Sequence, residues 1–372
     1  MKQAGREWAA LFTSFLVDWG MHRSTIDVCL YTYVCGSIIL WVLIYVDDAL
    51  ICDNDVTTRT RFVNDLSKRF PTEDKGELEW ILNIKIVRDR AARVLSMSQA
   101  LHVSDLLQKF EVYAPAKHAR TYDTPAEEGL SLSSDGQPMI GSREWHDMAT
   151  FREAYMGIVG GLLWLANNTY IQLTYVTGQL ARFMTNPGPS HFKAATRVLH
   201  YLRNACDVPL TFKPDTTRTL EIYVDSSWST RFSCSGALYM YHGCIIHWFS
   251  KMQRSVTLSS AEAEFFGAMM AARDAMFVRE VLADLELPVS GACIIYSDSK
   301  SAIDMAFDPI AFKKTKHILR AAEFLRDLVA RLVITFRHLA GAQMPADILT
   351  KAVSRAIYNT LMSLITQSGS IE

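Results

Sequence analysis

The sequence predicts an α/β (α+β) fold whose second half is a mixed sheet flanked by helices. Short β-rich runs bounded by turn formers recur there, and Gly243 marks a tight turn between two of them. Longer helical stretches separate the later runs. The expected strands are 219–225, 235–241, 244–250, 292–297 and 332–336, and the expected helices are 259–286 and 316–330. This alternation is typical of a sheet with helices on its faces.

The first part of the chain predicts a β-hairpin. An apolar run from Ile38 to Val46 is interrupted by Asp47 and Asp48 and resumes from Ala49 to Cys52. The two acids would lie at the hairpin tip. An aspartate pair between strands is more often only a turn.

The middle of the chain predicts a linker followed by helices. Residues 131–141 are rich in serine, glycine and aspartate and include Pro138, so we place a domain boundary near residue 140. The expected helices are 148–168, 171–185 and 189–205. The resulting domains are 1–130, 131–215 and 216–372.

Length and composition indicate substantial apolar cores. The chain has 372 residues, of which 49% are hydrophobic. The longest apolar runs are much shorter than the roughly 20 residues of a membrane-spanning helix, so we expect no membrane partner. The first residues lack the pattern of a signal peptide. We expect a cytoplasmic location, with a virus-like particle or the nucleus as alternatives.

The seven cysteines are scattered, and none forms a Cys-x-x-Cys pair. They mostly fall inside apolar runs, so we expect reduced core residues. The ten histidines form no paired ligand spacing with them, and zinc is not predicted.

Four acids in the second half suggest a metal site. Asp225 and Asp298 close apolar strand candidates, Glu264 lies on the long helix, and Asp347 opens a helix after Pro345. Each acid taken singly is more often a turn former or an N-cap. Four carboxylates brought together would repel one another, and a hard cation with oxygen ligands such as Mg2+ relieves that repulsion.

The sequence around these acids resembles the ribonuclease H domain of copia-type retrotransposon polyproteins. Five blocks match in the family's order: Tyr223–Trp228 (YVDSSW), Leu258–Phe265 (LSSAEAEF), Tyr296–Ile303 (YSDSKSAI), Lys314–Ile318 (KTKHI) and Ala346–Lys351 (ADILTK). The resemblance implies a ribonuclease H-like domain after a helical connection.

The resemblance also implies a two-metal hydrolysis of the RNA strand of an RNA-DNA hybrid. Asp225 would bridge two Mg2+ (or Mn2+) ions about 4 Å apart, with Glu264 and Asp298 on one ion and Asp347 on the other. Glu262 competes with Glu264, and the family pattern favours the acid followed by an aromatic. His338 stands near the position of a mobile histidine in related enzymes, but a structural role is the stronger expectation.

A second resemblance covers the hairpin. Tyr45-Val46-Asp47-Asp48 is similar to the Tyr-x-Asp-Asp signature of the reverse transcriptase palm, where Asp47 and Asp48 would help hold catalytic metals. The flanking blocks Lys2–Trp8 and Lys75–Ile86 are also copia-like, although Asn83 stands where the family commonly has glycine. The family's third palm acid lies upstream of the first block. We therefore expect a partial reverse transcriptase palm and thumb, active only if another part of the Pol polyprotein supplies that acid.

Nucleic-acid contact is expected from a local basic patch, because the formal net charge is only -1. The patch consists of Lys313, Lys314, Lys316 and Arg320, at the start of an amphipathic helix. A solvated helix face is the alternative. Two further functions stay open: a catalytically inert nucleic-acid-binding remnant, and an RNA-directed DNA polymerase completed by another chain.

Overall fold

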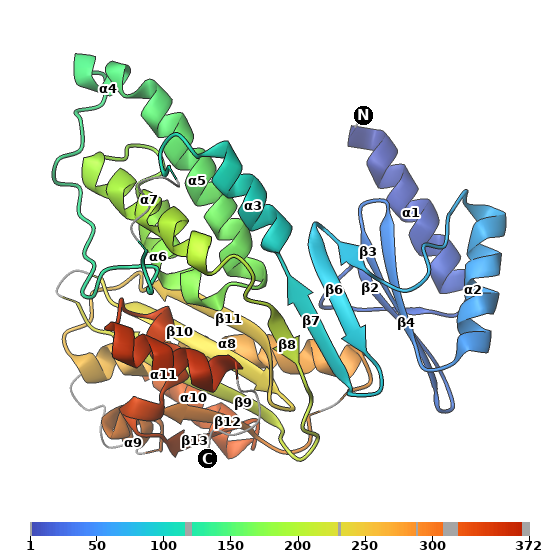
Figure 1. Cartoon of the computed structure of the whole chain (residues 1–372). Coiled ribbons are helices and arrows are strands. Elements are labelled where there is room, and N and C mark those ends of the chain that lie inside the picture. The colour runs from blue at the N-terminus through green and yellow to red at the C-terminus, as the bar shows by residue number, and fades with distance from the viewer. Residues whose placement is uncertain (1, 116–120, 230–231, 288, 308–318, 367–372) are drawn as a thin grey trace. The chain divides into compact units, whose positions relative to one another are not determined.

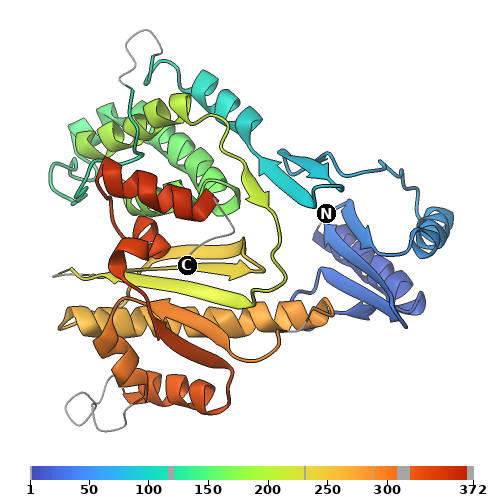
Figure 2. The same ribbon diagram turned by 60° about the horizontal axis from the view of Figure 1, so that its bottom comes forward.

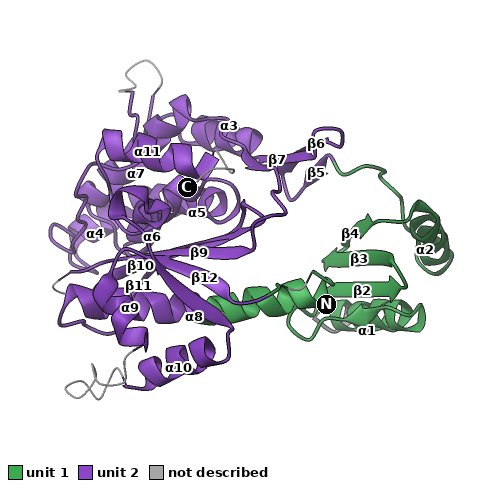
Figure 3. Cartoon of the chain, turned by 90° about the horizontal axis from the view of Figure 1, so that it is seen from below, with its two compact units in different colours: residues 1–78, 273–290 green, residues 79–272, 291–372 purple. Residues whose placement is uncertain are grey.

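The computed structural model describes residues 2–115, 121–229, 232–287, 289–307 and 319–366. The chain forms two compact units (Figure 3). Unit 1 comprises residues 1–78 and 273–290, and unit 2 comprises residues 79–272 and 291–372. The domain boundaries predicted near residues 130 and 215 were drawn from sequence motifs, whereas these units are defined by packing. The predicted domains therefore stay a prediction.

Unit 1 contains a four-stranded antiparallel sheet in the order β1-β2-β3-β4, packed against two helices. Its elements are α1 (Lys2–Asp18), β1 (His22–Arg23), β2 (Leu30–Cys35), β3 (Ile38–Tyr45), β4 (Asp48–Asp53) and α2 (Val56–Arg69). Phe12 of α1, Leu40 of β3 and Phe62 of α2 share the buried core. The Asp55 carboxylate accepts the Thr58 N–H at 2.8 Å and so begins α2.

Residues 273–290 belong to unit 1 through side-chain and backbone contacts. The Ser24 hydroxyl donates to the Asp284 carboxylate. The Thr32 hydroxyl donates to the Asp284 carbonyl at 2.7 Å. Ser24 also accepts the backbone N–H groups of Ile26 and Asp27, so the start of unit 1 and a segment more than 200 residues later form one structure.

Unit 2 begins with a small sheet and a helical layer (Figure 1). The sheet is β5 (Trp80–Ile81), β6 (Ile84–Asp89), β7 (Val94–Ser98) and β8 (Leu210–Phe212), in that order. The helices are α3 (Ala100–Lys109), α4 (Arg143–Asp147), α5 (Ala149–Asn168), η2 (Ile171–Leu173), α6 (Thr174–Ala181) and α7 (Pro189–Asn204). Their buried core includes Tyr155, Leu162 and Val198. The three helices expected at 148–168, 171–185 and 189–205 correspond to α5, η2 with α6, and α7.

The second half of the chain forms a five-stranded mixed sheet in the order β11-β10-β9-β12-β13. Its strands are β9 (Leu220–Ser227), β10 (Cys234–Tyr241), β11 (Cys244–Met252), β12 (Cys293–Ser297) and β13 (Ile334–His338). β10 is antiparallel to β9 and β11, and β12 is parallel to β9 and β13. This topology confirms the predicted fold class of a mixed sheet flanked by helices.

Helices cover both faces of that sheet, as Figure 2 shows. The remaining elements are α8 (Ser260–Asp284), α9 (Lys300–Phe307), α10 (Leu319–Ala330), η4 (Gly341–Gln343), η5 (Pro345–Leu349) and α11 (Arg355–Thr366). On one face, the Tyr239 hydroxyl donates to the Ala271 carbonyl of α8 at 2.9 Å. On the other, Leu238 packs with Leu349 and Leu361 of η5 and α11.

Several details differ from the sequence expectations. β9 continues to Ser227, because Ser227 still pairs with Cys234, so Asp225 lies inside the strand rather than at its end. Asp347 lies in the 3-10 turn η5, which the Thr350 N–H closes onto the Asp347 carbonyl at 3.2 Å.

The cysteine expectation was partly wrong. All seven cysteines are free, but Cys29, Cys35, Cys52 and Cys206 are exposed, and only Cys234, Cys244 and Cys293 are buried. Cys35 and Cys52 lie on strands, and a strand with one solvent-facing side exposes part of an apolar run. Cys29 and Cys206 lie in connections outside the strands and helices. Separately, none of the described helices has an apolar stretch long enough to cross a membrane.

Candidate active site

Three of the four predicted acids converge. Asp225 lies on β9, Glu264 on the second turn of α8, and Asp298 directly after β12. One carboxylate oxygen from each lies within 4.8 Å of the other two. Among the residues that the structure describes, this is the one group of three or more acids, histidines or cysteines with such spacing.

The fourth acid, Asp347, adjoins this cluster through a lysine. The Lys351 ammonium lies 3.0 Å from Asp347 Oδ2 and 3.7 Å from Asp225 Oδ2. The Asp225 side chain is 4% exposed and that of Asp347 is 14% exposed, whereas that of Lys351 is 43% exposed. A single cation thus links the strand acid to the turn acid.

Asp225 is held in place by the turn after η5. The Thr350 hydroxyl donates to Asp225 Oδ2, and Thr350 is 1% exposed. Gly236 pairs with Asp225 across the sheet and allows this approach. A Cβ at Gly236 would lie 2.5 Å from Leu349 Cβ and 2.9 Å from Thr350 Cγ2. A glycine inside a strand often marks such a close approach.

The electrostatics of the cluster show a surplus of negative charge. Burial and the charges of Asp225 and Asp298 raise the pKa of Glu264 to about 9. Burial and Asp225 raise the pKa of Asp347 to about 7 and also raise the pKa of Asp298. Burial opposes charge on Lys351, but Asp225 and Asp347 outweigh it, so its pKa is raised.

The donor set fits a hard divalent cation. Glu264 Oε2 and Asp347 Oδ1 are buried and have no hydrogen-bond partner. Buried oxygens without a partner are costly unless an ion or water satisfies them. Oxygen-only ligands suit Mg2+ or Mn2+. A Cβ at Gly341 would lie 3.2 Å from Asp298 Oδ2, so the loop after β13 runs close to the same carboxylate.

The two glutamates of the long helix have different surroundings. Glu262 accepts the Leu258 N–H at 2.6 Å, and its own N–H donates to Ser259 Oγ at 3.2 Å. These contacts resemble a capping box and give Glu262 a role in starting α8. Glu264 points its carboxylate into the cluster. The geometry therefore favours Glu264 over Glu262 as the metal ligand.

The other predicted site residues lie elsewhere. Asp47 and Asp48 lie at the tip of the β3–β4 hairpin, where Tyr45 pairs with Asp48, and both are exposed. They are not part of the three-acid group. Arg320 is exposed on the first turn of α10. The other basic-patch residues, Lys313, Lys314 and Lys316, lie outside the described residues. His338 Nε2 contacts the Asp298 carbonyl at 3.1 Å, so its observed contact is with backbone.

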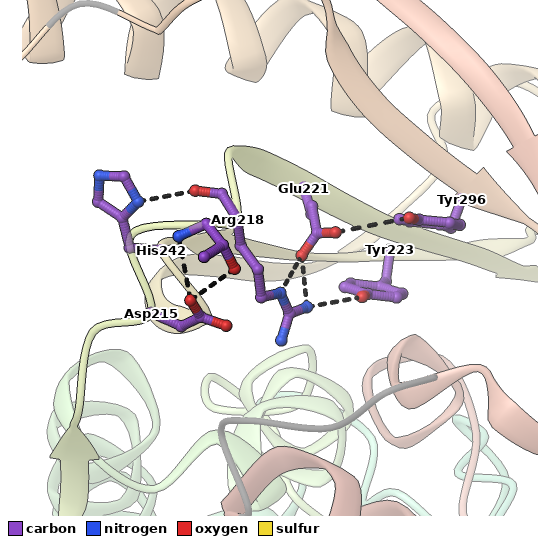
Figure 4. A network of polar contacts seen from close by, with 7 residues as sticks. Asp215, Arg218, Glu221, Tyr223, His242 and Tyr296 are labelled. Carbon is purple, nitrogen blue, oxygen red and sulfur yellow. Dashed lines mark hydrogen bonds and ion pairs between the residues drawn. The ribbon is translucent and has the colours of Figure 1, made fainter.

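A separate polar network is centred on Glu221 of β9, four residues before Asp225 (Figure 4). The Arg218 guanidinium donates to Glu221 Oε2 from Nε at 2.8 Å and also from Nη2, and it donates to the Tyr223 hydroxyl at 3.3 Å. Tyr223 stacks on Tyr296 of β12 with ring centroids 4.9 Å apart. The network joins β9 to β12, so it supports the two strands that carry Asp225 and Asp298.

Known proteins match this chain at two levels, a family model over its first part and relatives over nearly its whole length. The family model described as reverse transcriptase (RNA-dependent DNA polymerase) matches residues 1–126. The retrovirus-related Pol polyprotein from transposon TNT 1-94 of Nicotiana tabacum is 31% identical over 371 residues, which is 98% of this chain. The corresponding polyprotein from transposon RE1 of Arabidopsis thaliana is 30% identical over 369 residues. The chain belongs to the copia-type Pol family. It spans 27% and 24% of these two relatives.

Solved structures similar to this copia-type chain include ribonuclease H and reverse transcriptase proteins. The N-terminal RNase H domain of rv2228c from Mycobacterium tuberculosis has a TM-score of 0.29 and 17% identity, covering 41% of this chain and 99% of that one. The foamy viral protease-reverse transcriptase in complex with double-stranded DNA has a TM-score of 0.43 and 13% identity, covering 80% of this chain and 46% of that one. Because these similarities are weak, membership of the family rests on the sequence relatives.

Sequence reasoning missed two contributors to the site. Lys351 and Thr350 belong to the same copia-like block as Asp347, but nothing in that block indicates that they reach β9. The one sequence signal for this contact was Gly236, because a glycine inside a predicted strand often marks the close approach of another segment.

Proposed function

We propose that the copia-type ribonuclease H-like domain hydrolyses the RNA strand of RNA-DNA hybrids with divalent ions. The observation that carries this proposal is the convergence of Asp225, Glu264 and Asp298 from three separate elements within 4.8 Å. Asp225 and Glu264 are buried, and the pKa values of Glu264 and Asp298 are raised. Such a convergence is typical of functional sites rather than of surface turns.

Each residue has a role that its contacts support. Asp225, Glu264 and Asp298 would hold the ion, and Asp347 would hold a second one with Asp225. Bound divalent ions lower the pKa of water and stabilise charge on the leaving oxygen. Thr350 fixes Asp225 by its hydrogen bond, and Gly236 leaves space for that contact. Recognition of the hybrid would use the 2'-hydroxyl groups and groove shape, with Arg320 and the neighbouring lysines on phosphates.

The test is cleavage of an end-labelled RNA-DNA hybrid in Mg2+ or Mn2+ by the parent chain and two matched variants. Glu264→Gln removes a carboxyl group that could bind the ion, whereas Glu262→Gln keeps a side chain that can still cap α8. We expect cleavage of the RNA strand by the parent and by Glu262→Gln, and a loss of at least about 100-fold in Glu264→Gln. Equal cleavage by both variants would exclude Glu264 as a ligand.

An inert nucleic-acid-binding remnant is the competing outcome. Asp298→Asn separates the two, with Asp304→Asn at an exposed position of α9 as its control. A parent that folds and binds hybrid but cuts no RNA would contradict the enzyme proposal. Cutting by the parent and Asp304→Asn, but not by Asp298→Asn, would support it.

We propose RNA-directed DNA polymerase activity as a second function. It is favoured by the match of residues 1–126 to the reverse transcriptase family and by the Asp47–Asp48 hairpin tip. Primer extension, measured with an upstream palm segment of a copia-type Pol added, should be lost in Asp48→Asn. Extension that is unchanged in Asp48→Asn would contradict this assignment.

A further inference from the structure

Lys351 is the one feature of the cluster that the proposed function does not use. Its ammonium lies between two acids that belong to different elements, β9 and η5. Both acids are mostly shielded from solvent, whereas the lysine side chain is 43% exposed. A cation in this position offsets the cost of keeping two carboxylates close together.

The backbone places the base of the Lys351 side chain beside the acid pair. The Lys351 N–H donates to the Asp347 carbonyl at 3.2 Å. The preceding residue, Thr350, is tied to Asp225 by its side chain. The turn that carries Lys351 is therefore tied both to Asp347 and to Asp225. The Lys351 ammonium lies between Asp347 Oδ2 and Asp225 Oδ2.

The same two carboxylates are those that would share the second ion in the proposed two-metal reaction. A lysine and a divalent ion between them would repel each other, so they compete for one position. On the other side of Asp225, toward Glu264 and Asp298, the oxygen Glu264 Oε2 has no hydrogen-bond partner and can accept an ion.

We propose that Lys351 acts as a built-in cation at the Asp225–Asp347 position, so that the chain without nucleic acid binds a single divalent ion at Asp225, Glu264 and Asp298. The second ion binds only when the Lys351 ammonium leaves the acid pair. The exposed side of the lysine gives it a route to solvent or to a substrate phosphate. This proposal rests on the proposed function and makes Lys351 a positioning residue that sets ion occupancy.

The experiment counts Mn2+ bound to the full chain by titration calorimetry and by the electron paramagnetic resonance signal of free Mn2+, without nucleic acid. Lys351→Met and Lys351→Gln remove the charge, Lys351→Arg retains it, and Lys193→Met removes a charge from an exposed position of α7. We expect about one ion in the parent, Lys351→Arg and Lys193→Met. We expect about two in the uncharged Lys351 variants, with the added ion bound about tenfold or more tightly than in the parent.

A second readout is the thermal midpoint. The uncharged variants should melt lower than the parent in EDTA, because two carboxylates have lost their counterion, and Mn2+ should raise their midpoint more than that of the parent. Circular dichroism identifies any variant that fails to fold, and two uncharged side chains provide alternatives. Equal ion counts and affinities in the parent and a folded uncharged variant would overturn the proposal. So would two tightly bound ions in the parent.

Hybrid cleavage by the parent, measured separately, keeps the two proposals distinct. Cleavage together with unchanged ion counts would refute the role of Lys351 alone. The expected ion counts without any cleavage would refute the nuclease alone.

Discussion

Replacing Glu264 by glutamine is expected to stabilise the metal-free protein at neutral pH, even though it should abolish hydrolysis. Burial and two neighbouring carboxylates raise the pKa of Glu264 to about 9. The unfolded chain ionises this group near its ordinary value of 4.5. Because the folded pKa is the higher one, the group contributes most to stability below pH 4.5, and that contribution is lost as the pH rises toward 9.

The size of the stability gain follows from the difference between the ordinary pKa of Glu264 and the pH of the experiment. Each unit costs about 1.4 kcal/mol, and pH 7 lies about 2.5 units above 4.5. Folding at pH 7 thus carries a penalty of about 3 kcal/mol to keep Glu264 protonated. Glutamine has nearly the same shape as the protonated acid and carries no such penalty. At pH 5 the gain should shrink to about 1 kcal/mol.

The assay is urea unfolding in EDTA at pH 5 and pH 7, followed by tryptophan fluorescence. Since the chain has two compact units, two transitions are expected, and the one that Mn2+ shifts in the parent belongs to the unit with the cluster. Glu262→Gln is the control, because it makes the same chemical change two residues earlier and leaves the cluster intact.

The reasoning would be refuted by a Glu264→Gln variant no more stable than the parent at pH 7. A gain of the same size at pH 5 and pH 7 would also refute it, because a titrating group must give a pH-dependent difference. With saturating Mn2+ the order should reverse, since the parent gains ion binding that the variant has lost.

Four other changes test separate parts of the structure. Arg218→Met leaves Glu221 without its buried partner and should cost about 3–5 kcal/mol by urea unfolding, whereas full stability would show that the pair contributes little. Asn83→Gly should raise stability by up to about 1 kcal/mol, because Asn83 has a φ of 62°; a lower urea midpoint would contradict this. Burial lowers the pKa of His191. Neutral His191 therefore favours folding above pH 6.5, and this contribution is lost as the pH falls. His191→Gln should flatten the decline in thermal midpoint between pH 7 and pH 5. Arg320→Ala should reduce the salt dependence of hybrid binding by about one phosphate contact, and an unchanged slope would remove Arg320 from the interface.

The sheet and three of the acids were predictable because their signals are local. Asp225 and Asp298 follow apolar β-runs, and parallel neighbouring strands bring such positions to one edge of a sheet. β9 and β12 are parallel neighbours, with Tyr223 opposite Tyr296. Glu264 was separable from Glu262 only by family pattern, and the structure adds the physical reason, since Glu262 is engaged at the start of α8.

The rest depends on contacts that no local pattern encodes. Lys351 reads as an ordinary charged residue after a turn, and its place between two acids arises from the docking of η5 on β10 at Gly236. The apolar pattern of 259–286 predicts one long helix, and α8 is one helix. The pattern does not indicate that the last part of that helix packs in a different unit from its beginning.

The discontinuous make-up of unit 1 constrains when the nascent chain can fold. Residues 1–78 leave the ribosome before residues 273–290, and Ser24 and Thr32 find their partner only at Asp284. At about 5–20 residues per second, the roughly 200 intervening residues take about 10–40 s to synthesise. During that interval the first 78 residues lack one of their packing elements, and contacts so distant in sequence form slowly. Unit 1 is therefore completed only after translation of the helix that carries Glu264, and until then residues 1–78 expose the surface that this helix later covers.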